Sequence, residues 1–136
     1  MNPTTPLRVV ALAGRTGLAH GQHAPEDPYV ADVWLPVLGP ASYVVWRQLA
    51  RTASGVGQRS TTLAALSAAT GLGSPGGNQS GVNRALRRLQ RFGLVHLDDD
   101  RVVVRTRLPF VTGRQLARLD PAIQATHRQY RTCDAS

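Results

Sequence analysis

The sequence has few of the residue types on which catalysis, metal binding and covalent cross-linking depend. It has no lysine, a single cysteine and only 8 acidic residues among 136. Because Cys133 is alone, an intramolecular disulfide and a zinc site built from cysteines are excluded. Aromatic residues make up 5% of the chain, so we expect one domain with a core of leucine, valine and alanine.

Long apolar runs are missing as well. The run Leu7–Ala13 is far shorter than the roughly 18–20 residues of a membrane span. Too little positive charge precedes this run for a secretory signal. The sequence therefore predicts a cytoplasmic protein with no membrane partner.

Patterns for an enzyme or a metal site are weak. Gly14–Gly17 is not a phosphate loop, because no Gly-Lys-Ser/Thr follows it. His20 and His23 stand three residues apart beside Glu26 and Asp27, but two histidines without a third fixed ligand are better explained as polar loop residues. His127 has no serine, cysteine or carboxylate spaced to make it a catalytic base. We therefore predict no enzymatic activity, no cofactor and no metal.

Arginine is abundant and unevenly distributed. The net charge is +8, and all 16 cations are arginine. Residues 33–97 hold seven arginines and no acid, whereas residues 1–32 carry a net charge of −1 and residues 98–136 one of +2. The exclusive use of arginine partly reflects coding bias, but the segregation of the acids does not. Such a block attracts polyanions.

A basic amphipathic helix is predicted near the middle of the chain. One of its sides is apolar at helical spacing, with Val82, Ala85, Leu86, Leu89 and Phe92. The opposite side carries Ser80, Arg84, Arg87 and Arg91, with Arg88 at the boundary. Asn78 or Ser80 is predicted to cap the first turn, and Gly93 to end the helix in the left-handed conformation.

A hairpin is predicted directly after this helix. Leu94–Leu97 and Arg101–Arg105 are expected to be short strands because of their β-branched content, with Asp98–Asp100 between them. Three carboxylates at this tip would repel phosphate, so the tip is predicted to point away from DNA. A compatible explanation is that aspartate is simply favoured in turns.

Several other elements are predicted on either side. Leu7–Ala13 is either a strand, pairing with the hairpin or a partner, or part of a mobile arm. Trp34 and Trp46 have apolar neighbours and are assigned to the core rather than to base stacking. The remaining expected helices are Ala41–Ala53, Leu63–Thr70, a short one from Thr112 to Leu119 and one over Pro121–Arg131.

Val33–Leu49, VWLPVLGPASYVVWRQL, resembles the amino-terminal winged-helix domains of DnaD/DnaB-type replication-initiation proteins. The matching residues are Trp34, Leu35, Pro36, Leu38, Gly39, Pro40, Tyr43 and Trp46. Thr61–Arg105 is similar to winged-helix regulators of the MarR, plasmid and phage kinds, in which the recognition helix ends in a Gly-Leu-Val step. The resemblance covers about half of the chain. The connector Gly71–Gly77 and the last two helices depart from these families.

Together these observations predict a mainly α fold with a small β-hairpin (α+β), a winged helix-turn-helix with extra C-terminal helices. The expected segments are a flexible or partly ordered arm (1–32), the winged-helix domain (33–108), C-terminal helices (109–131) and a disordered tail (132–136). Winged helices often pair through terminal helices, so we predict a homodimer. Its predicted contacts are Ile123, His127 and Tyr130.

The first functional hypothesis is sequence-specific binding of double-stranded DNA, by a transcriptional regulator or a plasmid- or phage-type accessory factor. Arg84 would read guanine, Asn83 or Gln79 adenine, and Arg87, Arg88 and Arg91 would hold phosphates. The predicted DNA contacts are Gln79, Ser80, Asn83, Arg84, Arg87, Arg88, Arg91, Arg47, Arg51, Arg59, Arg101 and Arg105. The alternative is a docking module in a larger assembly, whose basic face meets an acidic protein or RNA. The related primosomal domains often self-associate and bind partners.

Overall fold

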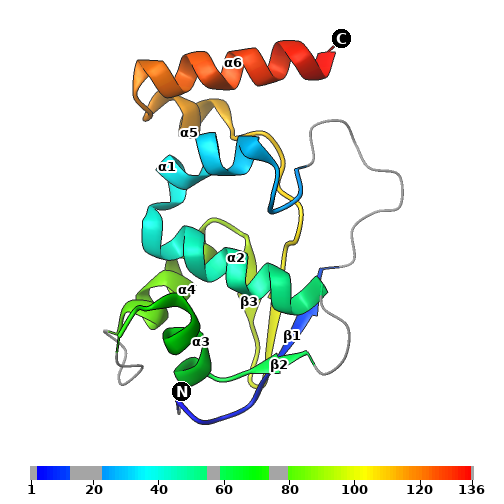
Figure 1. Cartoon of the computed structure of the whole chain (residues 1–136), viewed down its shortest axis with the longest axis vertical. Coiled ribbons are helices and arrows are strands. Elements are labelled where there is room, and N and C mark those ends of the chain that lie inside the picture. The colour runs from blue at the N-terminus through cyan, green and yellow to red at the C-terminus, as the bar shows by residue number, and fades with distance from the viewer. Residues whose placement is uncertain (1–2, 13–22, 55–58, 74–79, 136) are drawn as a thin grey trace. The chain divides into compact units, whose positions relative to one another are not determined.

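The computed structural model describes residues 3–12, 23–54, 59–73 and 80–135. Its contacts divide the chain into two compact units (Figure 1). The first lies within Met1–Leu12 and Pro40–Thr106, and the second within Ala13–Gly39 and Arg107–Ser136. The fold is α+β, as predicted. The units differ from the segments expected from the sequence, because each is assembled from two separate stretches of chain.

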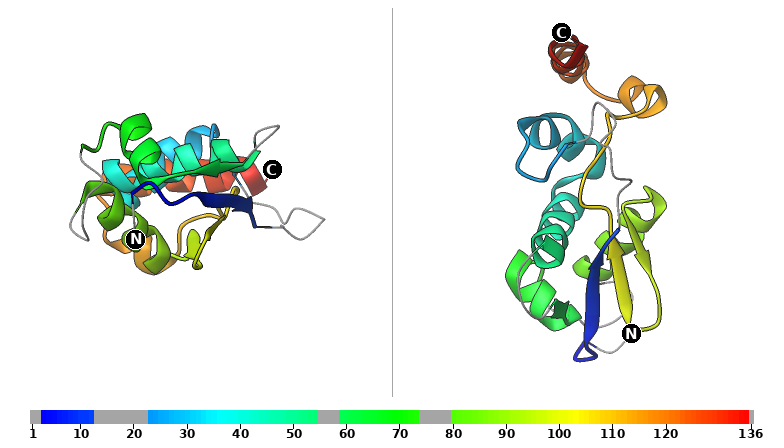
Figure 2. Two further views of the ribbon diagram at one scale, coloured as in Figure 1. Left: turned by 90° about the horizontal axis from the view of Figure 1, so that it is seen from below. Right: turned by 90° about the vertical axis from the view of Figure 1, so that its right-hand side faces the viewer.

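The first unit consists of helices packed on a four-stranded sheet. Its elements are β1 (Leu7–Ala11), α2 (Pro40–Ser54), β2 (Ser60–Thr61), α3 (Leu63–Thr70), α4 (Gly81–Arg91), β3 (Val95–Leu97) and β4 (Arg101–Val104). The strand order is β2-β1-β4-β3. Strand β1 runs antiparallel to β2 and parallel to β4, and β3 and β4 form an antiparallel hairpin. Helix α2 packs against α3, α4 and the sheet (Figure 2).

Local sequence signals set the ends of α3 and α4. The Thr62 hydroxyl accepts a hydrogen bond from the Ala65 amide at 3.0 Å, and Gly71 ends α3 at a φ of 73°. The Ser80 hydroxyl likewise accepts from the Asn83 amide at 3.2 Å. After α4, Gly93 has a φ of 75°, and the Leu94 amide returns to the Leu89 carbonyl at 3.0 Å. The caps predicted at Ser80 and Gly93 are confirmed, whereas Asn78 lies outside the described residues.

Strand β1 is the strand predicted within Leu7–Ala13, and it pairs with the hairpin. Leu7 and Val9 are each only 1% exposed, because alternate residues of β1 face the helices. The Val9 amide donates to the Arg59 carbonyl at 2.8 Å, and the Leu12 amide to the Val104 carbonyl at 2.8 Å. The alternative of a mobile arm is therefore wrong for these residues, which form an inner strand.

The buried side chain of Val9 should contribute to the stability of the first unit. We expect Val9→Ala to lower the free energy of unfolding by about 2 kcal/mol, because it removes two buried carbons and leaves a cavity. Val10→Ala is the matched control, since Val10 is the next residue of the same strand and is only half-buried. Urea denaturation measures both variants. Equal effects at the two positions would contradict the placement of β1.

The second unit joins the segment before α2 to the end of the chain. It contains a π-helix, η1 (Val30–Trp34), and the helices α1 (Leu35–Leu38), α5 (Gly113–Ala117) and α6 (Pro121–Ala135). Thr112 and Gln115 form a reciprocal capping box at α5. Helix α6 continues through the stretch 132–135, which was expected to be a disordered tail. No proline or glycine follows Pro121 to stop it.

Both tryptophans belong to the core, as predicted. Trp34 is 3% exposed and Trp46 is 0% exposed. The Trp34 indole donates to the Pro109 carbonyl, and the Trp46 indole to the Arg105 carbonyl, each at 2.8 Å. Each indole therefore ties a helical segment to a strand or loop within its own unit.

Candidate nucleic-acid interface

Helix α4 has one buried side and one cationic side. Val82, Ala85, Leu86 and Leu89 are at most 3% exposed. The opposite side is what we call the arginine face: Arg84, Arg87, Arg88 and Arg91, all of them exposed. Together with Gln90, these arginines line an open hollow of about 760 Å³. The Arg88 guanidinium lies 5.5 Å from the centre of the Phe92 ring, which restricts its side chain.

The first turn of α4 is less open than the arginine face. Ser80 and Asn83 are half-buried, and the Ser80 hydroxyl is engaged as the helix cap. A Cβ at Gly81 would lie 3.2 Å from the Leu72 carbonyl oxygen, so the start of α4 closely approaches the segment after α3. Gln79, a predicted base contact, lies outside the described residues.

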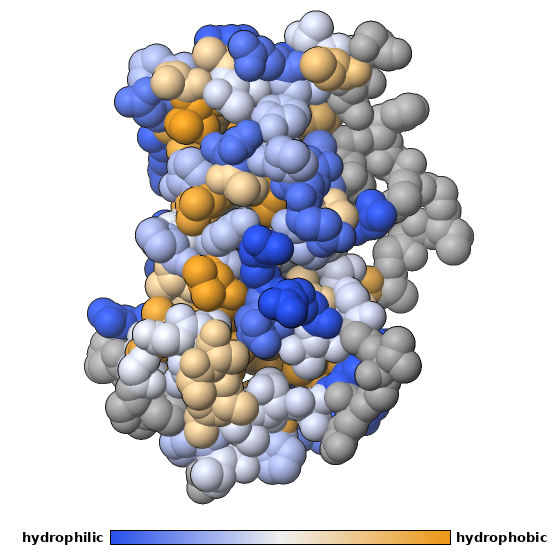
Figure 3. Space-filling view, in the orientation of Figure 1, coloured by the Kyte–Doolittle hydropathy of each residue, from blue (hydrophilic) through white to orange (hydrophobic). Residues whose placement is uncertain are grey.

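Two other predicted contacts, Arg47 and Arg51, lie on α2. Arg51 is exposed and lies roughly 140° around α2 from the buried Trp46. Arg51 therefore lies away from the buried side through which α2 packs. Figure 3 shows strongly hydrophilic side chains over α2. Arg47 is half-buried and lies 5.9 Å from the Tyr43 ring centre.

One carboxylate of the acidic tip, that of Asp98, contacts basic side chains within the hairpin. Asp98 accepts from the Arg101 guanidinium at 2.7 Å and lies 3.3 Å from the Nε2 atom of His96. The hydrogen bond from Arg101 is the main reason why the pKa of Asp98 is lowered. Arg101 is thus engaged within the hairpin, and its predicted DNA contact would require breaking or sharing this pair.

The sheet adds a cation that the sequence-based prediction missed. Strand β1 aligns Arg8 with Arg101, and the Arg8 amide donates to the Asp100 carbonyl at 2.9 Å. The backbone of Arg8 therefore lies beside the acidic tip, and its side chain is exposed. Only the parallel pairing of β1 with β4 brings these residues together. Arg105, half-buried, follows β4 at the opposite end of the hairpin, and the exposed Arg59 precedes β2.

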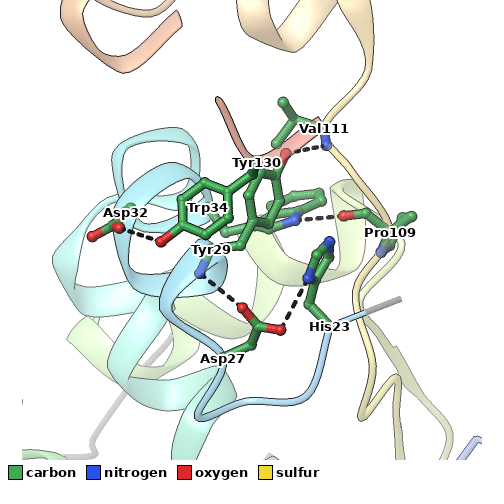
Figure 4. A network of polar contacts seen from close by, with 8 residues as sticks. All are labelled: His23, Asp27, Tyr29, Asp32, Trp34, Pro109, Val111 and Tyr130. Atoms are coloured by element: carbon green, nitrogen blue, oxygen red, sulfur yellow. Dashed lines mark hydrogen bonds and ion pairs between the residues drawn. The ribbon is translucent and has the colours of Figure 1, made fainter. Parts of the chain in front are cut away.

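Two of the three proposed dimer contacts on α6, His127 and Tyr130, form hydrogen bonds to other residues of the second unit. His127 is 8% exposed and lies 2.9 Å from the Tyr29 hydroxyl through Nδ1. The Tyr130 hydroxyl donates to Asp32 at 2.7 Å (Figure 4), and this hydrogen bond raises the pKa of Tyr130 to about 12. Ile123 is half-buried. His127 is thus buried within its own chain, whereas the Tyr130–Asp32 hydrogen bond is exposed. Dimerisation itself stays a prediction.

Tyr29 is the centre of this cluster. It is 0% exposed, and its hydroxyl accepts a hydrogen bond from the Val111 amide at 2.9 Å (Figure 4). Its own proton can be donated to Nδ1 of His127 when that nitrogen carries no proton. His23 stacks on the Tyr29 ring with centroids 4.4 Å apart, and its Nδ1 atom lies 3.1 Å from Asp27. Burial raises the pKa of Tyr29 and lowers that of His127.

The lowered pKa of His127 predicts a loss of stability in acid. Below a pH of about 6.5 the unfolded chain takes up this proton more readily than the folded chain, so the free energy of unfolding falls with pH. The decline should level off below the folded-state pKa. In His127→Asn an amide oxygen can accept from Tyr29 without titrating. Urea denaturation between pH 7 and pH 5 should therefore show a shallower decline for the variant, and identical profiles would contradict this assignment.

The described residues were also compared with the requirements of a metal site and of a membrane-spanning helix. Within the described ranges no three histidine, cysteine or acidic side chains are grouped so that they could hold a metal ion. Of the histidines and acids considered as metal ligands in the sequence, His23 pairs with Asp27. His20 lies outside the described ranges. Among the described helices, none is long and apolar enough to cross a membrane.

Comparisons with known proteins add nothing to this geometry. No family model, no curated protein and no solved structure matches the chain. The resemblance to winged-helix domains therefore stays a prediction carried by the chain's own residues.

Proposed function

We propose that this chain is a winged-helix protein that binds double-stranded DNA through the arginine face of α4. The observation that carries the proposal is the pairing of four exposed arginines with a fully buried apolar side on a single helix. A helix of this kind fits the major groove of B-DNA, where cationic side chains reach the phosphates at the groove edges.

The order of elements in the first unit supports the winged-helix assignment. From α2 onward the order is helix, short strand, helix, helix and hairpin, with α4 in the position of the recognition helix. The main departure is β1, which lies between β2 and β4. A transcriptional regulator and a plasmid- or phage-type accessory factor are both compatible with this arrangement.

The docking alternative receives less support from the surface. Protein interfaces usually have an apolar or aromatic core, often with large anchoring side chains. In the part of the chain that the structure describes, the exposed large hydrophobic residues are Leu12 and Val44, at 52% and 40%. The arginine face therefore favours a polyanion over an apolar partner.

A competition experiment separates the two candidates. A labelled duplex at about 50 mM salt is titrated with the protein, and polyglutamate or unlabelled duplex is then added as competitor. We expect unlabelled duplex to displace the label at far lower charge equivalents than polyglutamate. Co-purification of a stoichiometric protein partner, together with no duplex binding at this salt concentration, would favour docking and overturn the proposal.

A further inference from the structure

Helix α6 packs on the second unit with very little buried apolar surface. Of its side chains that the structure describes, at positions 121–133, only that of His127 is buried. Helix α4, by comparison, buries four apolar side chains, although it has 11 residues and α6 has 15. Since hydrophobic stabilisation grows with the apolar area removed from water, it contributes less to the docking of α6 than to that of α4.

Three pairs of side chains tie the second half of α6 to the rest of the second unit. They are His127–Tyr29, Tyr130–Asp32 and Arg131–Phe110. The first pair is buried, with 2.9 Å between Nδ1 and the hydroxyl, whereas the second is exposed to water. In the third, the guanidinium lies 4.8 Å from the ring centre. The one buried anchor of the helix is therefore a histidine, whose charge changes near neutral pH.

Protonation would disturb the hydrogen bonding of this anchor. The Tyr29 hydroxyl already accepts from the Val111 amide, and neutral His127 with a bare Nδ1 can accept the hydroxyl proton. Once Nδ1 carries a proton it can only donate, so Tyr29 loses the acceptor that it has in the structure. Tyr29 is 0% exposed, and a hydrogen bond lost at a buried group is costly.

The charges closest to His127 also disfavour its protonated form. Arg128 and Arg131 belong to the same helix, and both are cations. Burial lowers the pKa of His127, and the charges of Arg131 and Arg128 lower it further. From the neighbouring segments, the ring of Phe110 and the hydroxyl of Tyr29 face the imidazole, and neither carries a charge.

The carboxylates of the cluster contact other side chains. Asp27 lies 3.1 Å from Nδ1 of His23, the second histidine that packs on Tyr29 (Figure 4). Asp32 accepts from Tyr130 (Figure 4). A proton on His23 would thus have a carboxylate beside it, whereas a proton on His127 would have two arginines. This contrast singles out His127 as the histidine whose protonation opposes the packed arrangement.

We propose that His127 is a proton-sensitive latch, so that protonation of its ring releases α6 from the rest of the second unit without global unfolding. Release would uncover the side chains of Tyr29 and Phe110, on which α6 packs. The latch goes beyond the stability change expected from His127, because it assigns the first opening to a single helix. It does not depend on DNA binding by α4.

The expected pH dependence follows from proton linkage. In the released helix the pKa of His127 returns to about 6.5, above its value in the docked helix. Below about pH 6.5 the released form therefore binds more protons, and the opening constant rises by up to about 10-fold per pH unit. The rise ends below the pKa of the docked form, and above about pH 7 the constant should not change.

Hydrogen exchange of the full chain, followed by mass spectrometry, tests the latch. Protection factors, which are corrected for the intrinsic effect of pH, are compared at about pH 7.5 and about pH 5.5. We expect protection of the α6 amides to fall by up to about 10-fold in wild type. In His127→Asn it should stay constant, because an amide accepts from Tyr29 without titrating. His96→Asn, at an exposed histidine of the first unit, is the matched control and should behave as wild type.

Low concentrations of urea distinguish release from global unfolding. Opening of one helix exposes little surface, so exchange of the α6 amides at the lower pH should hardly respond to urea. A strong response would show that they exchange through global unfolding and would overturn the latch. Protection that does not change with pH in wild type, or falls as steeply in His127→Asn, would overturn it as well. So would α6 amides that are unprotected at the higher pH, because the helix would then not be docked.

Discussion

Replacing two arginines of the arginine face, in Arg87→Ala/Arg91→Ala, is expected to weaken duplex binding about 60-fold at 0.1 M salt. Each arginine that neutralises a phosphate contributes about 0.9 to the slope of log K against log salt, because it releases condensed counterions. Losing two such contacts lowers log K by about 1.8 at this concentration. Fluorescence anisotropy with a labelled duplex measures the change.

Arg114→Ala/Arg118→Ala is the matched control for this prediction. Both residues are exposed arginines of the second unit, so this variant has the same net charge as the first one. Its affinity should stay close to that of wild type. If the two double variants lose affinity equally, overall charge and not the arginine face determines binding. All four substituted arginines are exposed, so the free energy of unfolding should change by no more than about 0.5 kcal/mol per substitution.

The largest effect on stability is expected for Trp46→Ala. Trp46 is 0% exposed within the first unit, and its indole is the hydrogen-bond donor to the Arg105 carbonyl. Truncation leaves a large cavity, which typically costs about 3–5 kcal/mol. Leaving a half-buried carbonyl without its donor adds to this cost. Since small domains are stable by only about 5–15 kcal/mol, the variant should be close to unfolded.

Two further variants test the cause of this loss. Trp46→Phe keeps much of the packing but removes the indole N–H, so it should cost clearly less than the alanine substitution. Val44→Ala serves as the control, because Val44 is on the same helix and 40% exposed. Urea denaturation gives all three free energies. A loss below about 1 kcal/mol for Trp46→Ala would contradict the placement of this residue at the centre of the core.

The local elements could largely be predicted from the sequence because their signals are local. Apolar spacing and a hydroxyl cap determine α4, and Thr62 and Gly71 bracket α3. The hairpin follows from its β-branched residues on both sides of an aspartate turn. Each of these signals operates within a few residues and needs no knowledge of the rest of the chain.

Long-range arrangement could not be predicted in the same way. The parallel pairing of β1 with β4 joins residues more than 90 positions apart, so nothing near Arg8 indicates that it lies beside Arg101. The Tyr29–His127 hydrogen bond spans 98 positions and draws a proposed dimer contact into the chain's own core. The split into two discontinuous units has the same origin, because composition along a chain reports only on neighbours.

The sequence was sufficient to predict the arginine face of α4, but not which other arginines of the chain belong to the same surface. Helical spacing alone placed Arg84, Arg87 and Arg91 together. Net charge also suggested that Arg47 and Arg51 extend this surface, but both lie on another helix, where Arg47 is half-buried and Arg51 is exposed. A charge count records how many cations a segment holds, and only the packing determines which of them share a face.

The most direct test of DNA binding by the arginine face is the salt dependence of wild-type affinity for a duplex. With Arg87, Arg88 and Arg91 on phosphates, a plot of log K against log salt should be linear with a slope of about −2.7, and steeper if Arg105 also contributes. A slope near zero, or no measurable duplex binding at about 50 mM salt, would contradict the account.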